Sequence, residues 1–151
     1  MKVVQNVFWV FYIGNNAKEL REDKCGKWMY FFDNLSFVSD ICKKAVQSGV
    51  VREAKHSNAE KGVSCFYLNC DEIENHKKVL KFFIENGLIK KTKAGKYYNI
   101  SFKKDDQTRN GEYGTDFHSE LTLSDFVDLE TGRWKDEQYF IRKRISAVYH
   151  R

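Results

Sequence analysis

The fold is decided by the change of pattern that follows one stretch of the chain, Gly26-Lys27-Trp28-Met29-Tyr30-Phe31-Phe32. The stretch alternates as a strand does and places the rings of Trp28, Tyr30 and Phe32 on one face. Directly after it, apolar residues recur at helical spacing over 35–48, and Gly49 stands where a glycine commonly ends a helix. A strand that leads straight into a helix indicates a protein with both kinds of element.

The same two patterns continue on either side of this unit. A second helix is predicted to begin after Asp71, because Asp71 is a good N-cap and Glu74 completes a capping box three residues later. A short helix is predicted near Ser124, and Tyr139 to Tyr149 reads as a final strand, with a helix as the alternative. Further strands are predicted over Val3 to Ile13, Val50 to Ser57, Gly62 to Leu68 and Lys96 to Lys103.

Strands outnumber helices in this pattern, and the two do not alternate regularly. That order predicts an α+β fold, with a mainly antiparallel or mixed sheet and two or three helices on one of its faces. The length of 151 residues predicts a single domain over 1–151 with a sizeable core.

Composition limits the classes of function. A net charge of +5 favours anionic partners without requiring a nucleic acid. The four cysteines form no CxxC pair, and no histidine stands at zinc-ligand spacing, so no metal site is expected. Nucleotide-binding and hydrolase motifs are absent from the sequence, so no cofactor is expected either. No apolar run approaches the ~20 residues of a membrane helix, and we expect a cytoplasmic protein.

The polar segment from Phe102 to Gly114 is the first candidate for a binding site. It holds the cations Lys103 and Arg109 together with the hydroxyl groups of Thr108 and Tyr113. Cations on a turn can surround a phosphate or carboxylate, and hydroxyl groups can then orient it. A solvated hairpin turn is the alternative, because Asp, Asn and Gly are ordinary turn residues.

A second candidate is the pair Lys55 and His56 at the end of a predicted strand. A lysine and a histidine can act as base and acid on one ligand, but neighbours on a strand point to opposite faces. The pair therefore shares a site only if the strand bulges there. Trp28 could stack on a base if it lies on the ligand face, and the alternative is that its ring lies in the core.

Four short motifs follow one another over 26–114: Gly26-Lys27-Trp28, Ala54-Lys55-x-Ser57, Val63-x-Cys65-x-Tyr67 and Lys103-x-Asp105-x-x-Thr108-x-x-Gly111-x-Tyr113. Taken in this order, they resemble the motifs of the basophilic leukemia expressed protein family. Bacterial relatives of that family are often labelled phosphothreonine lyase domain proteins. The sequence departs from the family pattern at Gln107, where an aromatic residue is common, and at His56, where a hydrophobic residue is common.

The resemblance implies a fold like that of the cap-binding translation initiation factor 4E, a curved antiparallel sheet backed by helices with a concave face for a ligand. It also implies that Lys55, Lys103, Thr108 and Tyr113 gather near one site. The leading hypothesis is a binding domain for a phosphorylated ligand, either a small molecule such as a nucleotide or a phosphopeptide. In this hypothesis cations neutralise the phosphate, hydroxyl groups orient it and one ring stacks on a base; these residues are Lys55, Lys103, Arg109, Thr108, Tyr113 and Trp28.

Two alternatives stay open. One is an enzyme, a phosphothreonine lyase in which Lys55 or Lys103 is the base and His56 the acid. The other is a module that binds a protein or a nucleic acid through its surface cations, which includes an inhibitor of a host system. Steep salt dependence of binding would favour the nucleic acid.

Overall fold

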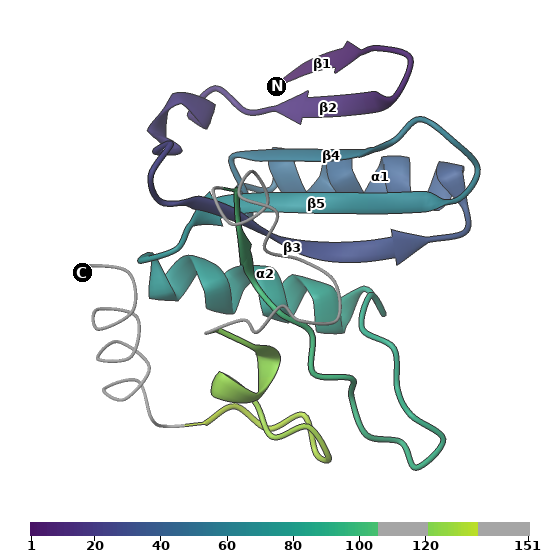
Figure 1. Cartoon of the computed structure of the whole chain (residues 1–151), viewed down its shortest axis with the longest axis vertical. Helices are drawn as coiled ribbons and strands as arrows, with labels where there is room; N and C mark the ends of the chain where they lie inside the picture. Colours follow the sequence, from purple (N-terminus) through teal and green to yellow (C-terminus); the bar gives the residue numbers. More distant parts are fainter. Residues whose placement is uncertain (106–120, 136–151) are drawn as a thin grey trace.

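The computed structural model describes residues 1–105 and 121–135. A six-stranded antiparallel sheet forms one layer, and the two α-helices of the described residues form the other (Figure 1). The predicted α+β class, with a curved sheet backed by helices, is confirmed. In chain order the elements are β1 (Lys2–Gln5), β2 (Trp9–Ile13), a 3₁₀ helix (Ala17–Glu19), β3 (Cys25–Phe32), α1 (Leu35–Gln47), β4 (Glu53–Ser57), β5 (Gly62–Asn69), α2 (Ile73–Glu85), β6 (Lys103–Lys104) and a second 3₁₀ helix (Leu123–Asp125).

The strands follow the order β1-β2-β4-β5-β3-β6 across the sheet. The long strands β3 and β5 pair along their whole length, from Cys25 opposite Asn69 to Phe32 opposite Gly62. By contrast, β6 pairs with β3 only at Gly26 and Lys27. The outer half of β3 therefore lies at an edge of the described sheet.

Both α-helices pack on the same face of the sheet, which we call the helix face. Phe66 of β5 contacts the rings of Phe82 and Phe83 on α2, and His56 of β4 contacts Ser39 on α1. Phe66 and Ser64 of β5 pair with Ala54 and His56 of β4, so these contacts are made from one side. Figure 1 shows α1 behind β4 and β5. Because side chains alternate along a strand, the residues between these point to the other side, which we call the open face.

The first helix forms where the sequence predicts it, and its ends explain why. The side chain of Asn34 accepts a hydrogen bond from the Phe37 N–H at the N-terminus. At the other end Gly49 has a φ of 78°, a left-handed conformation that favours glycine.

The predicted cap of the second helix is wrong. Glu72 occupies the N-cap position and makes no side-chain cap hydrogen bond. Asp71 instead binds the guanidinium of Arg21 at 2.7 Å, and Glu72 binds that of Arg52 at 2.8 Å. Both carboxylates thus bind arginines from distant parts of the chain, and the Glu72 carboxylate also accepts from the Asn69 N–H at 3.2 Å.

Three other predictions need correction. Residues Val3 to Ile13 form a hairpin rather than one strand, because the Asn6 side chain accepts hydrogen bonds from the N–H groups of Phe8 and Trp9 and turns the chain. The predicted strand over Lys96 to Lys103 is reduced to β6, since residues 96–102 make isolated bridges only. The short helix near Ser124 is a 3₁₀ turn, and the strand predicted over 139–149 lies outside the described residues.

Within the described ranges, no helix is both long and apolar enough to span a bilayer.

Candidate functional site

One row of side chains crosses the open face in register. Glu53 of β4 lies opposite Tyr67 of β5, Tyr67 opposite Lys27 of β3, and Lys27 opposite Lys103 of β6. Because directly opposite residues share a face and lie about 5 Å apart, these side chains are immediate neighbours. The row therefore runs from a carboxyl group through a phenol to two neighbouring ammonium groups.

A second row runs beside the first and adds another lysine. Lys55 of β4 lies opposite Cys65 of β5, which lies opposite Met29 of β3. The Lys55 ammonium rests over the Trp9 ring of β2, with Nζ at 3.9 Å from the ring centroid. The negative face of an indole ring attracts a cation, so this contact favours one position of the Lys55 ammonium. The structure thus brings Lys55 and Lys103, the two lysines that the sequence singles out, to one face of one sheet.

Several groups in these rows are buried although they lie on the open face. Lys27 is 9% exposed and Tyr67 is 7% exposed. Burial is the largest cause that raises the pKa of the Tyr67 phenol, and it likewise raises the pKa of the Cys65 thiol. Cys25 lies outside the two rows, half-buried and two residues before Lys27 on the same face, and burial followed by the charge of Asp105 raises its pKa to about 12. These phenol and thiol groups are therefore protonated near neutral pH and can donate hydrogen bonds.

Asp105 supplies a carboxylate that binds one of the lysines. Its Oδ1 lies 2.8 Å from Lys27 Nζ, and the two groups form a salt bridge. Burial and the nearby charge of Lys27 lower the pKa of Lys103. Burial is also the largest cause that raises the pKa of Glu53, whereas Lys55 lowers it. Together these groups form one cluster on the open face: Lys27, Lys55, Lys103, Tyr67, Cys65, Glu53 and Asp105. Within it Asp105 pairs with Lys27, and the charge of Lys27 makes protonation of Lys103 less favourable.

His56 does not belong to this cluster. It points to the helix face, where its Nδ1 donates to the Ser57 carbonyl at 2.8 Å and its Nε2 accepts from the Tyr12 hydroxyl at 3.1 Å. Burial lowers its pKa, so the ring is neutral near pH 7. The strand has no bulge that would turn Lys55 and His56 to one side. The prediction of His56 as the acid partner of Lys55 is therefore wrong, and the alternation of a regular strand is the reason.

Trp28 is also placed on the helix face. It is 0% exposed, and its indole N–H donates to His76 Nδ1 at 3.1 Å. Its ring packs against Phe102 and Phe126. The prediction that Trp28 stacks on a ligand is wrong, because the whole ring lies in the core.

Thr108, Arg109 and Tyr113 lie outside the described residues, so their predicted part in the site stays a prediction. Lys27, Tyr67 and Glu53 are members of the cluster that the sequence did not single out as site residues. The sequence does show that Lys27 points to the other face of β3 from Trp28, and Tyr67 to the other face of β5 from Phe66, because side chains alternate along a strand. The register that sets them side by side is not, because it depends on how distant strands pair.

The described residues contain no group of three or more His, Cys, Asp or Glu side chains placed to hold a metal ion. What the cluster offers chemically is positive charge beside protonated hydroxyl and thiol donors. Comparison with protein-family models and with curated proteins found no match to this chain.

Proposed function

We propose that the open face of the sheet binds a phosphorylated ligand, either a nucleotide-like small molecule or a phosphopeptide. The observation that supports this most is the placement of Lys27, Lys55 and Lys103 on one face of the sheet, with the Tyr67 phenol on the strand between Lys55 and Lys27. The family resemblance described above points to the same class of ligand and belongs to the proposal. Thr108, Arg109 and Tyr113 remain candidate ligand residues from the sequence.

The chemistry of the cluster fits a dianion. Lysine ammonium groups neutralise phosphate as point charges, and partial burial strengthens each interaction relative to one in bulk water. The Tyr67 hydroxyl can donate to a phosphate oxygen because its raised pKa keeps it protonated. Asp105 is the internal competitor, since its carboxylate already lies 2.8 Å from Lys27 Nζ. An incoming phosphate oxygen takes the position of this carboxylate.

The test is calorimetric titration of the full chain with pyrophosphate, AMP and a phosphothreonine peptide. We expect Lys27→Met and Lys103→Met each to weaken binding about tenfold, because each removes one charge-assisted hydrogen bond. Asp105→Asn should strengthen it, because the competing carboxylate is gone. The matched control is Lys93→Met, which removes an equal charge from an exposed lysine outside the cluster.

Two results would reject the proposal. One is the absence of binding by the unmodified chain to all of these ligands at about 1 mM. The other is an equal loss of affinity in Lys93→Met and Lys27→Met, which would mean that only the net charge matters.

A lyase is the second candidate, and the lowered pKa of Lys103 favours it. In β-elimination a neutral lysine takes the α-proton of phosphothreonine, the bond from Cβ to the phosphate oxygen breaks, and a double bond forms between Cα and Cβ. His56 lies on the other face, so the protonated Tyr67 is the group that can donate to the departing phosphate. Mass spectrometry of a phosphothreonine peptide should then show loss of phosphoric acid that Lys103→Ala abolishes. Equal product in both chains would reject this candidate.

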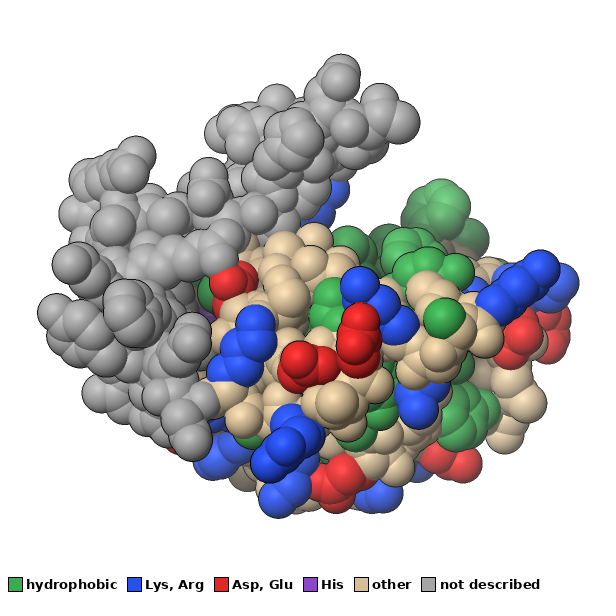
Figure 2. All heavy atoms as spheres, turned by 90° about the horizontal axis from the view of Figure 1, so that it is seen from below, with side chains coloured by type: hydrophobic (Ala, Val, Ile, Leu, Met, Phe, Trp, Pro, Cys, Tyr) green, Lys and Arg blue, Asp and Glu red, His purple; other side chains and the backbone are tan. Residues whose placement is uncertain are grey.

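The nucleic-acid alternative gains no support from the face shown in Figure 2. Basic and acidic side chains are interspersed there and form no continuous basic stripe. A nucleic-acid interface usually gathers its cations on one face or along one element.

A further inference from the structure

The outer edge of β3 faces a pocket instead of a strand. Pairing with β6 stops at Lys27, so within the described ranges Met29, Tyr30 and Phe31 have a strand partner on the β5 side only. Alternate residues of a strand direct their N–H and C=O groups to each side. The main chain of this part of β3 therefore presents hydrogen-bonding groups to the pocket.

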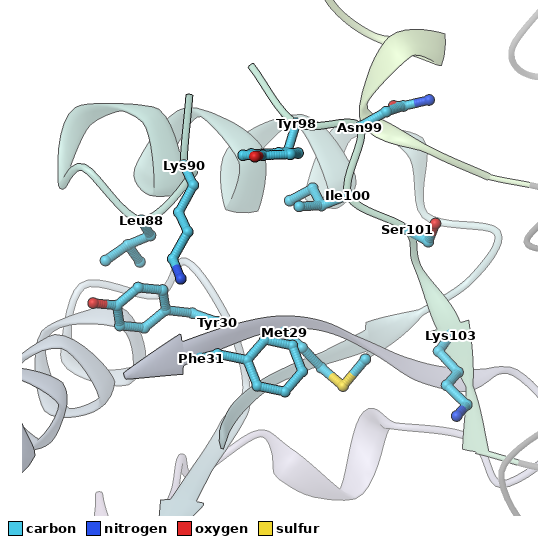
Figure 3. A pocket seen from close by; sticks show the side chains of 10 residues that line it. All are labelled: Met29, Tyr30, Phe31, Leu88, Lys90, Tyr98, Asn99, Ile100, Ser101 and Lys103. Atoms are coloured by element: carbon cyan, nitrogen blue, oxygen red, sulfur yellow. The ribbon is translucent and has the colours of Figure 1, made fainter. Parts of the chain in front are cut away.

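The pocket is a slot between this edge and the chain that leads back to β6. It has a volume of about 420 Å³, which lies in the range of specific binding sites. Figure 3 shows Met29, Tyr30 and Phe31 along one wall and Tyr98 and Ile100 along the other. The two walls diverge from the short β6 pairing, so the slot lies where the next strand of the sheet would run.

The lining of the slot is mainly apolar, and part of it is open to solvent. Phe31 is 64% exposed and Tyr98 is 53% exposed. Because Tyr30 and Phe31 are consecutive in a strand, they stand on opposite faces of the sheet. An added strand would therefore find an aromatic ring on each side for its alternating side chains.

The charge of the slot selects the occupant. Lys90 extends its ammonium into the slot beside Tyr30, and none of the ten lining residues is acidic (Figure 3). The other free edge of the sheet, β1, is exposed along Lys2–Gln5 and has no such walls. Of the two edges of the described sheet, only the β3 edge combines an unpaired stretch of main chain, a lined pocket and a lysine with no acidic residue in the lining.

We propose that this slot binds an extended peptide segment of a partner protein, apolar at alternate positions and flanked by acidic residues, which adds to the sheet as a strand beside β3. Main-chain hydrogen bonds to Met29–Phe31 supply affinity independent of sequence, whereas Lys90 and the two aromatic rings select the segment. The slot shares Lys103 with the cluster proposed to bind phosphate, but the strand addition is made at the main chain of Met29–Phe31, so it does not depend on the proposed function.

The test uses the heptapeptide acetyl-Glu-Val-Thr-Val-Thr-Val-Glu-amide and two-dimensional amide spectra of the labelled chain. We expect shifts that saturate below about 1 mM and centre on residues 29–32 and 98–101. The same peptide with N-methyl groups at alternate residues should not bind, because it cannot pair with a strand. Unaltered binding of the methylated peptide would overturn the proposal and would indicate a small apolar ligand site. Shifts centred on β1, or none at all, would overturn it equally.

A charge exchange tests the acidic preference. Lys90→Glu should weaken the acidic peptide about tenfold, because an attraction is replaced by a repulsion of similar size. A peptide with lysines in place of both glutamates should prefer Lys90→Glu over the unmodified chain. Lys93→Glu is the matched control, since Lys93 is also exposed but does not line the slot, and it should leave both affinities unchanged. Equal affinities in Lys90→Glu and the unmodified chain would overturn the assignment of an acidic segment.

Discussion

The two faces of the sheet use the same strands for different purposes. On the helix face the polar groups are neutral and closed into hydrogen bonds, as Trp28 with His76 and His56 with Tyr12 show. On the open face their immediate neighbours in sequence, Lys27 and Lys55, are lysines grouped with a phenol and carboxylates. A period of two residues therefore separates buried, hydrogen-bonded side chains from clustered lysines within a single strand.

Satisfied polar groups on the helix face make it the stabilising side. No buried side-chain nitrogen or oxygen of the described residues lacks a hydrogen-bond partner. His76 accepts from Trp28 and donates through Nε2 to the Cys70 carbonyl at 2.8 Å. A fully bonded buried network is costly to disturb, because each broken bond leaves a desolvated group without a partner.

The largest expected effect comes from breaking this network at Trp28. Trp28→Ala should lower the free energy of unfolding by about 4 kcal/mol, because it opens a cavity and leaves His76 Nδ1 without its donor. The matched control is Phe31→Ala, which truncates a ring that is 64% exposed on the open face of the same strand. Urea unfolding measures both. Similar losses in the two variants would contradict the division between the faces.

The next effect is a pH dependence that belongs to the helix face. Burial lowers the pKa of His76 to about 4, well below its usual value. The unfolded chain therefore binds a proton that the folded chain does not between these values, and stability falls as the pH drops through that window. The loss amounts to about 3 kcal/mol when the pH has passed from above 6.5 to 4, and His56 adds to it in the same direction.

Urea unfolding at pH 7, 6 and 5 checks this dependence above the range in which carboxylates titrate. His76→Gln should be less stable at pH 7 and should show a smaller loss on acidification. An unchanged pH slope in His76→Gln would assign the loss to other groups.

A smaller effect connects the two faces at Gly26. A Cβ at this position would lie 2.5 Å from the Phe102 ring and 2.7 Å from the Lys103 carbonyl oxygen. Gly26→Ala should therefore push β6 away from β3, at a cost of about 2 kcal/mol, and should separate Lys103 from Lys27. We expect the phosphate affinity to fall together with the stability.

Gly95→Ala is the control for this substitution. Gly95 has a φ of 82° and nothing within 4 Å of a Cβ, so the change strains the backbone without moving β6. It should lower stability by about 1 kcal/mol and leave the phosphate affinity unchanged. Loss of affinity in Gly95→Ala as well would show that the site responds to global stability and not to the position of β6.

Period and composition were enough to predict the fold class, the helix over 35–47 and the opposite orientation of Lys55 and His56. The single strand over 3–13 was wrong because an asparagine side chain can turn a chain within an apolar run. The cap at Asp71 was wrong because its partner, Arg21, comes from a distant part of the sequence. Local patterns contain no information on such tertiary competition.

The candidate site could be predicted only in part for a related reason. Lys55 and Lys103 stand out in the sequence, but their common face follows from the strand order β4-β5-β3-β6, which places two strands between them. Lys27 shares one side of its strand with Met29 and Phe31 and does not stand out until register sets it beside Lys103 and Tyr67. Register between distant strands depends on the packing of the whole core, so a short motif does not contain it.

The smallest expected effect concerns how the open face holds Lys55. Its Nζ lies 3.9 Å from the centroid of the Trp9 ring, a contact worth about 0.5–1 kcal/mol on a partly exposed surface. Trp9→Leu keeps an apolar residue but removes the ring face, so Lys55 should gain rotamer freedom and the phosphate affinity should fall about threefold. Phe8→Leu is the control, because Phe8 is 74% exposed in the neighbouring turn. If Trp9→Leu instead strengthens phosphate binding, the Trp9 ring competes with the ligand for the Lys55 ammonium, and the ammonium must leave the ring before the ligand binds.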